Sequence, residues 1–146
     1  MTIYTIGFTQ KTAERFFTLL KDHQVQLLVD IRLNNKSQLA GFTKGEDLGY
    51  FLRELCRCKY IHCEEYAPTK EILDAYKKKH IDWDGYVSQY LPLMERHQAA
   101  KKFLERFSEY ERVCLLCSEP TPERCHRRLL AELIQKAGPG ISVQHL

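Results

Sequence analysis

The chain has 146 residues, a common length for one domain, and its 44% hydrophobic and 28% charged residues are typical of a globular protein. The net charge of +3 permits phosphate binding but is weaker than the bias of a dedicated nucleic-acid-binding protein. No apolar run is long enough to span a membrane, and the first residues lack the basic flank and apolar core of a signal peptide. We therefore expect a cytoplasmic protein with no membrane partner, in which the six cysteines are free thiols, ligands or nucleophiles rather than structural disulfides.

The first half of the chain alternates strands and helices. Hydrophobic patterning predicts strands at 3–6 and 26–31, joined by a helix whose N-cap is Thr9 or Thr12. The polar, glycine-containing loop at 33–46 is long for a compact domain, as functional lids often are. A helical stripe at 48–55 and a short strand at 59–62 follow.

The second half continues the pattern with more helices. Helical segments are predicted around 72–76, 87–94 and 100–107, and Pro92 is expected to kink or split the second. A strand at 112–117 precedes a helix that we expect to begin with Thr121 as N-cap and Pro122 at its first position. This helix stops at Gly138, and a last strand covers 141–145.

This alternation predicts a single α/β domain over residues 1–146, with a mostly parallel sheet of about five strands and helices on both faces. Ligands of such sheets bind beyond the carboxyl ends of the strands. The residues expected at those ends are Gly7, Asp30, Arg32, His62, Cys117, Glu119 and His145. We therefore expect the site at this edge.

The strongest candidate group is Cys117-Ser118-Glu119 followed by Cys125-His126-Arg127. At a helix start, free backbone N–H groups favour an anion or a thiolate, and arginine can hold a phosphate in fork geometry. Glu119 is a candidate general base or a partner that orients Arg127. In the alternative interpretation, Cys117 is a small hydrophobic residue of a buried strand and Arg127 only forms a salt bridge.

Zinc is a weaker alternative for the same segment. Cys114 and Cys117 point to opposite faces of a strand, because their separation is odd, and adjacent Cys125 and His126 diverge on a helix. We therefore predict neither a metal nor another cofactor. A second thiol group at 56–63 holds Cys56, Cys58, His62 and Cys63, and three unconnected thiols are favoured there over a metal site or a reversible disulfide.

Two other groups allow both a structural and a functional interpretation. Asp30 and Arg32 end a strand before a long polar loop, so they line a ligand pocket or simply pair with each other. Trp83, Tyr86 and Tyr90 are core residues or a stacking surface for a base.

Three segments of the chain resemble the DUF488 family, a widespread group of small prokaryotic proteins of unknown function. They are Thr5-Ile6-Gly7-Phe8-Thr9, Val29-Asp30-Ile31-Arg32 and the late Cys117-Ser118-Glu119 with Cys125-His126-Arg127, in the family's order along nearly the whole chain. The chain departs from the family at 66–69, where many members have a Leu-Gly-Gly-like turn, and after Arg32, where many have proline and arginine. The resemblance implies the fold and the site but no reaction.

The residues and the resemblance together give a candidate site. Its predicted catalytic residues are Cys117, Glu119, Cys125, His126 and Asp30, and its predicted substrate-binding residues are Arg32, Arg127, Gly7 and Thr9. The first hypothesis is a protein that binds or acts on a phosphorylated ligand, such as a nucleotide or a nucleic-acid component. The alternatives are a redox or nucleophilic enzyme that uses Cys117 and Cys125, and a non-enzymatic regulatory or nucleic-acid-binding module.

Overall fold

The computed structural model describes residues 1–36 and 40–146 and contains a five-stranded sheet in which every pair of neighbours is parallel. The strand order is β3-β2-β4-β1-β5. The strands are β1 (Thr2–Gly7), β2 (Leu27–Asp30), β3 (Lys59–His62), β4 (Arg112–Cys117) and β5 (Ser142–His145). The predicted fold class and the position of each strand are confirmed.

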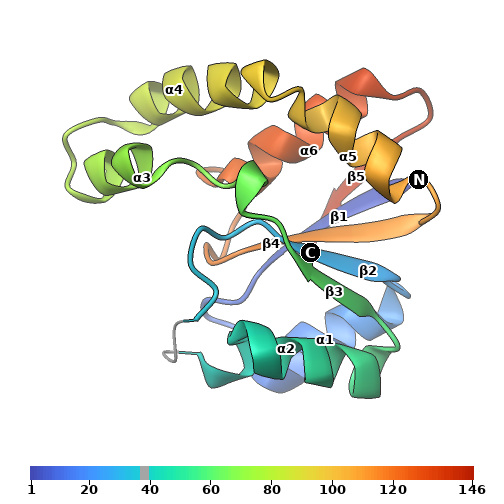
Figure 1. The fold of residues 1–146 in the computed structure, drawn as a ribbon. Helices are drawn as coiled ribbons and strands as arrows, with labels where there is room; N and C mark the ends of the chain where they lie inside the picture. Colours follow the sequence, from blue (N-terminus) through green and yellow to red (C-terminus); the bar gives the residue numbers. More distant parts are fainter. Residues whose placement is uncertain (37–39) are drawn as a thin grey trace.

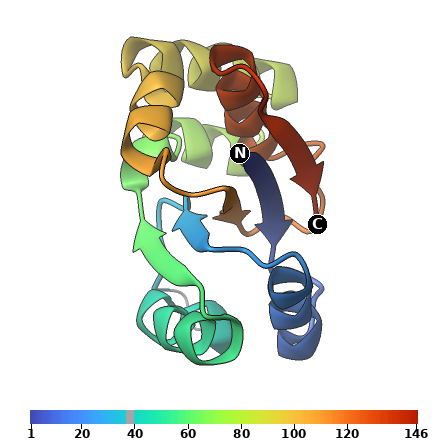
Figure 2. The same cartoon turned by 90° about the vertical axis from the view of Figure 1, so that its right-hand side faces the viewer.

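Helices cover both faces of this sheet (Figure 1). One face carries α1 (Ala13–Asp22), α2 (Gly45–Phe51) and the π-helical turn η2 (Leu52–Cys56). The other carries α3 (Lys70–Lys77), α4 (Trp83–Arg96), α5 (Ala99–Phe107) and α6 (His126–Ala137). The short 3₁₀ helices are η1 (Gly41–Thr43) and η3 (Glu64–Tyr66). Figure 2 shows the three layers from the side.

Alternate residues of the central strands enter two separate cores. On β4, Val113 and Leu115 pack with α4, α5 and α6, whereas Cys114 and Leu116 pack with α1 and α2. Both sets are fully buried. A strand covered on both faces gains from apolar residues at every position, which explains the continuous hydrophobic run in β4.

The start of α1, Pro92 in α4 and the loop before α2 were each predicted from the sequence. Thr12 is the N-cap of α1, and its side chain accepts a hydrogen bond from the backbone N–H of Arg15. Pro92 does not split its helix, because α4 continues through it as one element. The loop predicted at 33–46 contains η1 and ends where α2 begins at Gly45; its residues 37–39 lie outside the described part of the chain.

The predicted start of the last helix is wrong. Helix α6 begins at His126, and its N-cap is Cys125, whose backbone is extended (φ −139°, ψ 140°). Thr121 and Pro122 instead lie in turns between β4 and α6. Contacts of Cys125 with Cys117, and of Arg127 with the Glu119 carbonyl, fold this segment back over the end of β4.

Candidate functional site

A pocket of about 1410 Å³ lies beyond the carboxyl ends of β1, β2 and β4. It forms there because, after neighbouring strands, the chain turns toward opposite faces of the sheet. β1 and β2 lead to helices on one face, whereas β4, which lies between them, leads to α6 on the other. The diverging connections leave space above the sheet edge, which is where parallel sheets bind ligands.

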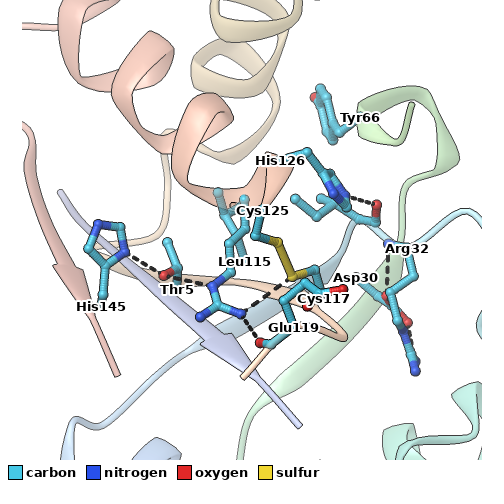
Figure 3. Close-up of a disulfide and its surroundings, with 12 residues drawn as sticks. Thr5, Asp30, Arg32, Tyr66, Leu115, Cys117, Glu119, Cys125, His126 and His145 are labelled. Atoms are coloured by element: carbon cyan, nitrogen blue, oxygen red, sulfur yellow. Dashed lines mark hydrogen bonds and ion pairs between the residues drawn. A yellow bond between two sulfur atoms is a disulfide. The ribbon is translucent and has the colours of Figure 1, made fainter. Parts of the chain in front are cut away.

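Two cysteines form the floor of this pocket. Cys117 is the last residue of β4 and Cys125 precedes α6, and their sulfur atoms form a disulfide (Figure 3). Both residues line the pocket although they are almost fully buried. Cys114 faces the opposite side of the sheet and lies in the core beside α1, as the odd separation from Cys117 predicts. This disulfide departs from the expectation that all six cysteines are free thiols, ligands or nucleophiles, and it joins the two cysteines that the redox alternative names as partners.

Arg127 contacts Cys117, one of the two cysteines of the disulfide. Its Nη1 donates to the Glu119 carbonyl (2.5 Å) and to Sγ of Cys117 (3.4 Å), and its Nε donates to Oγ1 of Thr5 (3.3 Å). The side chain is fully buried and does not line the pocket. Within residues 1–36 and 40–146, Arg127 forms no ion pair and its Nη2 has no hydrogen-bond partner. Burial lowers the pKa of this guanidinium.

Gly7 provides space for this arginine. A Cβ atom at position 7 would overlap the carbonyl oxygen of Glu119 and lie 2.5 Å from Nη1 of Arg127. The neighbouring strand places Gly7 in register with Cys117. Thr5, on the same strand, also forms a 2.6 Å hydrogen bond with Nδ1 of His145 at the end of β5. Hydrogen bonds of Arg127 and Thr5 thus link strands β1, β4 and β5.

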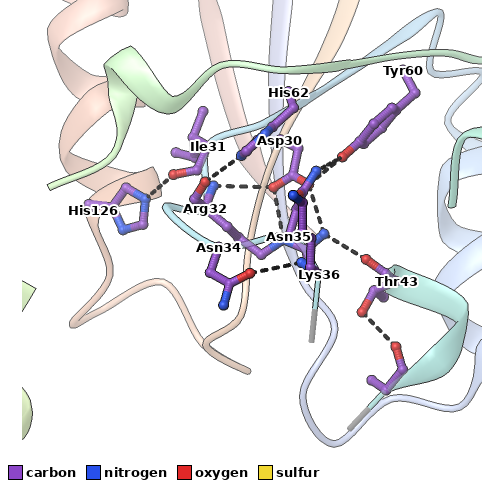
Figure 4. Close-up of polar contacts among 11 residues, drawn as sticks. Asp30, Ile31, Arg32, Asn34, Asn35, Lys36, Thr43, Tyr60, His62 and His126 are labelled. Carbon is purple, nitrogen blue, oxygen red and sulfur yellow. Dashed lines mark hydrogen bonds and ion pairs between the residues drawn. The ribbon is translucent and has the colours of Figure 1, made fainter. Parts of the chain in front are cut away.

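Asp30 and Arg32 form a closed, buried pair (Figure 4). Arg32 donates from Nε to Oδ1 (2.8 Å) and from Nη2 to Oδ2 (2.7 Å) of Asp30, and also from Nη2 to the Thr43 carbonyl (2.7 Å). The Tyr60 hydroxyl donates to the same Oδ2 (2.7 Å). Burial first, and then the Asp30 charge, raise the pKa of Tyr60, so this hydroxyl stays protonated as a donor. Because both Asp30 oxygens accept strong hydrogen bonds, the carboxylate is poorly placed for proton transfer.

His126 forms part of the pocket wall at the start of α6. Its Nε2 is 2.8 Å from the carbonyl oxygen of Ile31, and a carbonyl can only accept, so Nε2 carries a hydrogen. Burial is the main reason why the pKa of His126 falls to about 4. The ring is therefore neutral at neutral pH, and Nδ1 is left as a hydrogen-bond acceptor.

The walls of the pocket combine positive charge with aromatic rings. Five of the lining side chains are cationic and two are carboxylates: Lys11, Arg32, Lys77, Lys79 and Arg124 against Asp82 and Glu119. Burial, and then the charge of Arg127, lower the pKa of Lys11. The aromatic rings in the lining are Phe8, Phe42, Tyr76, Trp83 and Tyr86.

Two of the three aromatic residues singled out in the sequence reach the pocket. Trp83 and Tyr86 line it and stack with their ring centroids 5.0 Å apart. Tyr90 is core, because it is fully buried and its hydroxyl donates to the Tyr66 carbonyl.

The structure divides the nine predicted site residues into two groups. Thr9, Arg32, Cys117, Glu119, Cys125 and His126 line the pocket. Gly7, Asp30 and Arg127 lie below it and hold the lining residues in place. Sequence reasoning missed Thr5 and Tyr60, although a threonine between Tyr4 and Ile6 on a buried strand was a usable signal.

The second thiol group is not one site. Cys58 packs in the core beside α1 and Cys63 in the core beside α4, on opposite faces of the sheet. Both are free thiols, as is Cys56. In the described part of the chain, no three His, Cys, Asp or Glu side chains converge as they would around a metal ion. None of the helices described there is both long and apolar enough to cross a membrane.

Comparison with protein families identifies a match. The model of the domain of unknown function DUF488 matches residues 12–134, which include the Asp30–Arg32 pair, both pocket cysteines, His126 and Arg127. No curated protein and no solved structure matches the chain. The chain therefore belongs to the DUF488 family.

Proposed function

We propose that this protein binds a phosphorylated ligand, a nucleotide or nucleic-acid component, in the pocket above Cys117 and Cys125. The observation that carries the proposal is the composition of the pocket, in which cations outnumber carboxylates and aromatic rings form part of the wall. Lysine and arginine bind phosphate through charge and hydrogen bonds, and an aromatic face stacks on a base.

The neighbouring contacts suggest how the roles are divided. Arg124 is exposed on the turn before α6, and Lys11 follows β1, so both are available to a phosphate. Trp83 offers a ring to a base. Glu119 has an exposed carboxylate in the lining and is the candidate for proton transfer, whereas Asp30 is saturated by Arg32 and Tyr60.

The test is a thermal-shift screen of the wild type and Arg124→Ala against nucleotides, nucleosides, short RNA and DNA, and inorganic phosphate. Arg96→Ala, an exposed arginine at the end of α4 outside the pocket, is the matched control. A ligand present at about 100 times its Kd stabilises the folded state by about 2.7 kcal/mol. We expect Arg124→Ala to lose about tenfold in affinity, as for a lost charged contact, and Arg96→Ala to bind normally. Equal binding by all three proteins, or no binding by the wild type, would contradict the proposal.

A second candidate function is thiol–disulfide exchange, and the pairing of Cys117 with Cys125 in the pocket floor favours it. Reduction by a small dithiol would convert the disulfide to two thiols and oxidise the dithiol to its own disulfide. The measurement is the number of free thiols before and after mild dithiol treatment of the native protein. We expect two additional thiols in the wild type and none in Cys125→Ser. A wild type whose thiol count does not change would exclude this candidate.

A further inference from the structure

The buried charge of Arg127 lacks a partner of opposite sign. Its guanidinium is fully buried and donates to a backbone carbonyl, a threonine hydroxyl and the sulfur of Cys117, all neutral acceptors while the disulfide is closed. Within the described residues no carboxylate pairs with it. An uncompensated buried charge is costly, so an anion beside Nη1 would be strongly favoured.

Cys117 is the titratable group that contacts this cation, because its Sγ lies 3.4 Å from Nη1 of Arg127. We propose that in the reduced protein Cys117 is a thiolate paired with Arg127, which makes Cys117 the leaving sulfur when a thiol opens the disulfide at Cys125. The inference rests on the second candidate function, thiol–disulfide exchange. It adds the polarity of the reaction, that is, which of the two sulfurs is attacked and which one leaves. Arg127 is a positioning residue in this proposal, because it acts through Cys117.

Other charged groups around Arg127 and Cys117 do not supply the buried anion that Arg127 lacks. The titratable groups that interact electrostatically with Arg127 are Lys11 after β1, Glu119 and Glu123 in the turn before α6, His126 in α6, His145 on β5, and Cys114 on the opposite face of β4. The two carboxylates are exposed and solvated, so they compensate a buried cation only weakly. Burial first, and then the charge of Arg127, lower the pKa of His145, which disfavours a second cation beside Arg127.

The exchange has a defined course. An external thiolate donates an electron pair to Sγ of Cys125 and forms a mixed disulfide there. The bond between Cys125 and Cys117 breaks, and Cys117 takes the bonding pair as a thiolate beside Arg127. A second external thiolate then attacks the outer sulfur of the mixed disulfide, which releases the external disulfide and leaves Cys125 as a thiolate that takes a proton from water. Attack at Cys125 is favoured because the sulfur that is the weaker base leaves faster.

The remaining cysteines allow the ionisation to be measured directly. Burial raises the pKa of Cys58 and of Cys63 to about 12, and it also raises the pKa of Cys56 and of Cys114. All four thiols are therefore protonated at neutral pH. The ultraviolet absorbance of thiolates in the fully reduced protein then reports only on Cys117 and Cys125.

The test is a pH titration of this absorbance in reduced Cys125→Ser and reduced Cys117→Ser, without any ligand. We expect Cys125→Ser to carry one thiolate at neutral pH, with a midpoint at least one unit below about 8.5, the value of free cysteine. We expect Cys117→Ser to carry none or much less. A midpoint for Cys125→Ser at or above the free-cysteine value would overturn the proposal.

Replacement of the arginine tests the cause. In the Cys125→Ser background, Arg127→Lys should keep most of the low midpoint and Arg127→Met should raise it by at least one unit, about a tenfold loss of thiolate per unit. An Arg127→Met protein with an unchanged midpoint would overturn the role of Arg127. Should Arg127→Met fail to fold, the midpoints of thiolate formation in Cys125→Ser, with and without Arg127→Lys, still test whether Cys117 is a thiolate at neutral pH.

A separate experiment tests the direction of attack. The oxidised wild type is mixed briefly with glutathione, quenched with acid and digested, and the adduct is located by mass spectrometry. We expect the adduct on Cys125, and an adduct on Cys117 would refute the polarity. A protein that binds no nucleotide would still show a Cys117 thiolate if this inference holds. If Cys117 had the pKa of free cysteine while reduction of the wild type still released two thiols, only this inference would be refuted, and thiol–disulfide exchange would stand.

Discussion

Replacement of His126 should change how the stability of the protein depends on pH. Burial lowers the pKa of this ring from its ordinary 6.5 to about 4, so the folded state binds the proton less tightly than the unfolded state does. The resulting stability is fully present above pH 6.5 and is lost as the pH falls towards 4, because protons then favour the unfolded chain.

The magnitude follows from the size of the shift. Each pKa unit corresponds to about 1.4 kcal/mol, so a fall from 6.5 to about 4 gives at most about 3.5 kcal/mol. The ring is partly exposed, which makes this an upper limit. For a chain of 146 residues, about 3.5 kcal/mol corresponds to a Tm change of up to about 11 °C.

The assay is chemical denaturation of the wild type, His126→Gln and the control His80→Gln across this pH range. Glutamine keeps a donor for the Ile31 carbonyl but does not titrate, and His80 is exposed at the end of α3. We expect the wild type and His80→Gln to lose stability together as the pH falls, whereas His126→Gln loses distinctly less. A small slope should remain in His126→Gln, because burial also lowers the pKa of His145. Parallel profiles for all three proteins would refute the reasoning.

Two further predictions concern residues below the pocket. Gly7→Ala should destabilise the fold by about 2–4 kcal/mol in urea unfolding, because its Cβ would overlap the Glu119 carbonyl. Gly41→Ala, where a Cβ meets nothing within 4 Å, is the control; equal effects of both changes would show that the close approach is unimportant. Tyr60→Phe should cost about 1–3 kcal/mol, because buried Asp30 loses a donor, and exposed Tyr50→Phe should cost little. A Tyr60→Phe protein as stable as Tyr50→Phe would contradict the role of this hydrogen bond.

The sequence predicted the sheet better than the site. Strand β4 matches its predicted residues because its apolar run is buried on both faces, so local pattern and tertiary position agree. The start of α6 was predicted wrongly because Thr121 and Pro122 favour a helix start locally. Cys125 and Arg127 instead contact Cys117 and the Glu119 carbonyl, each eight residues earlier, and these contacts override the local preference.

Six of the nine predicted site residues line one pocket, but the sequence did not show which six would do so. Arg127 follows His126 directly, yet one side chain is fully buried and the other lines the pocket. Neighbouring residues of a helix point about 100° apart, and only the packing of α6 on β1 and β4 decides which one faces the sheet. Similarly, Trp83 lines the pocket because α3 and α4 are placed above the sheet edge, and their own pattern does not encode that placement.

In this pocket, the residues that stabilise the fold differ from the residues that carry the excess positive charge, because Arg32 pairs with Asp30. Arg32 is already neutralised by Asp30 within the fold, so the excess positive charge of the pocket belongs to the other four cationic lining residues, here called the rim: Lys11, Lys77, Lys79 and Arg124. Rim residues can be exchanged at little cost in stability, whereas the buried pair cannot. If the pocket binds the proposed ligand, its preference is therefore open to redesign, by evolution or in the laboratory, through changes to the rim that leave the Asp30–Arg32 pair intact.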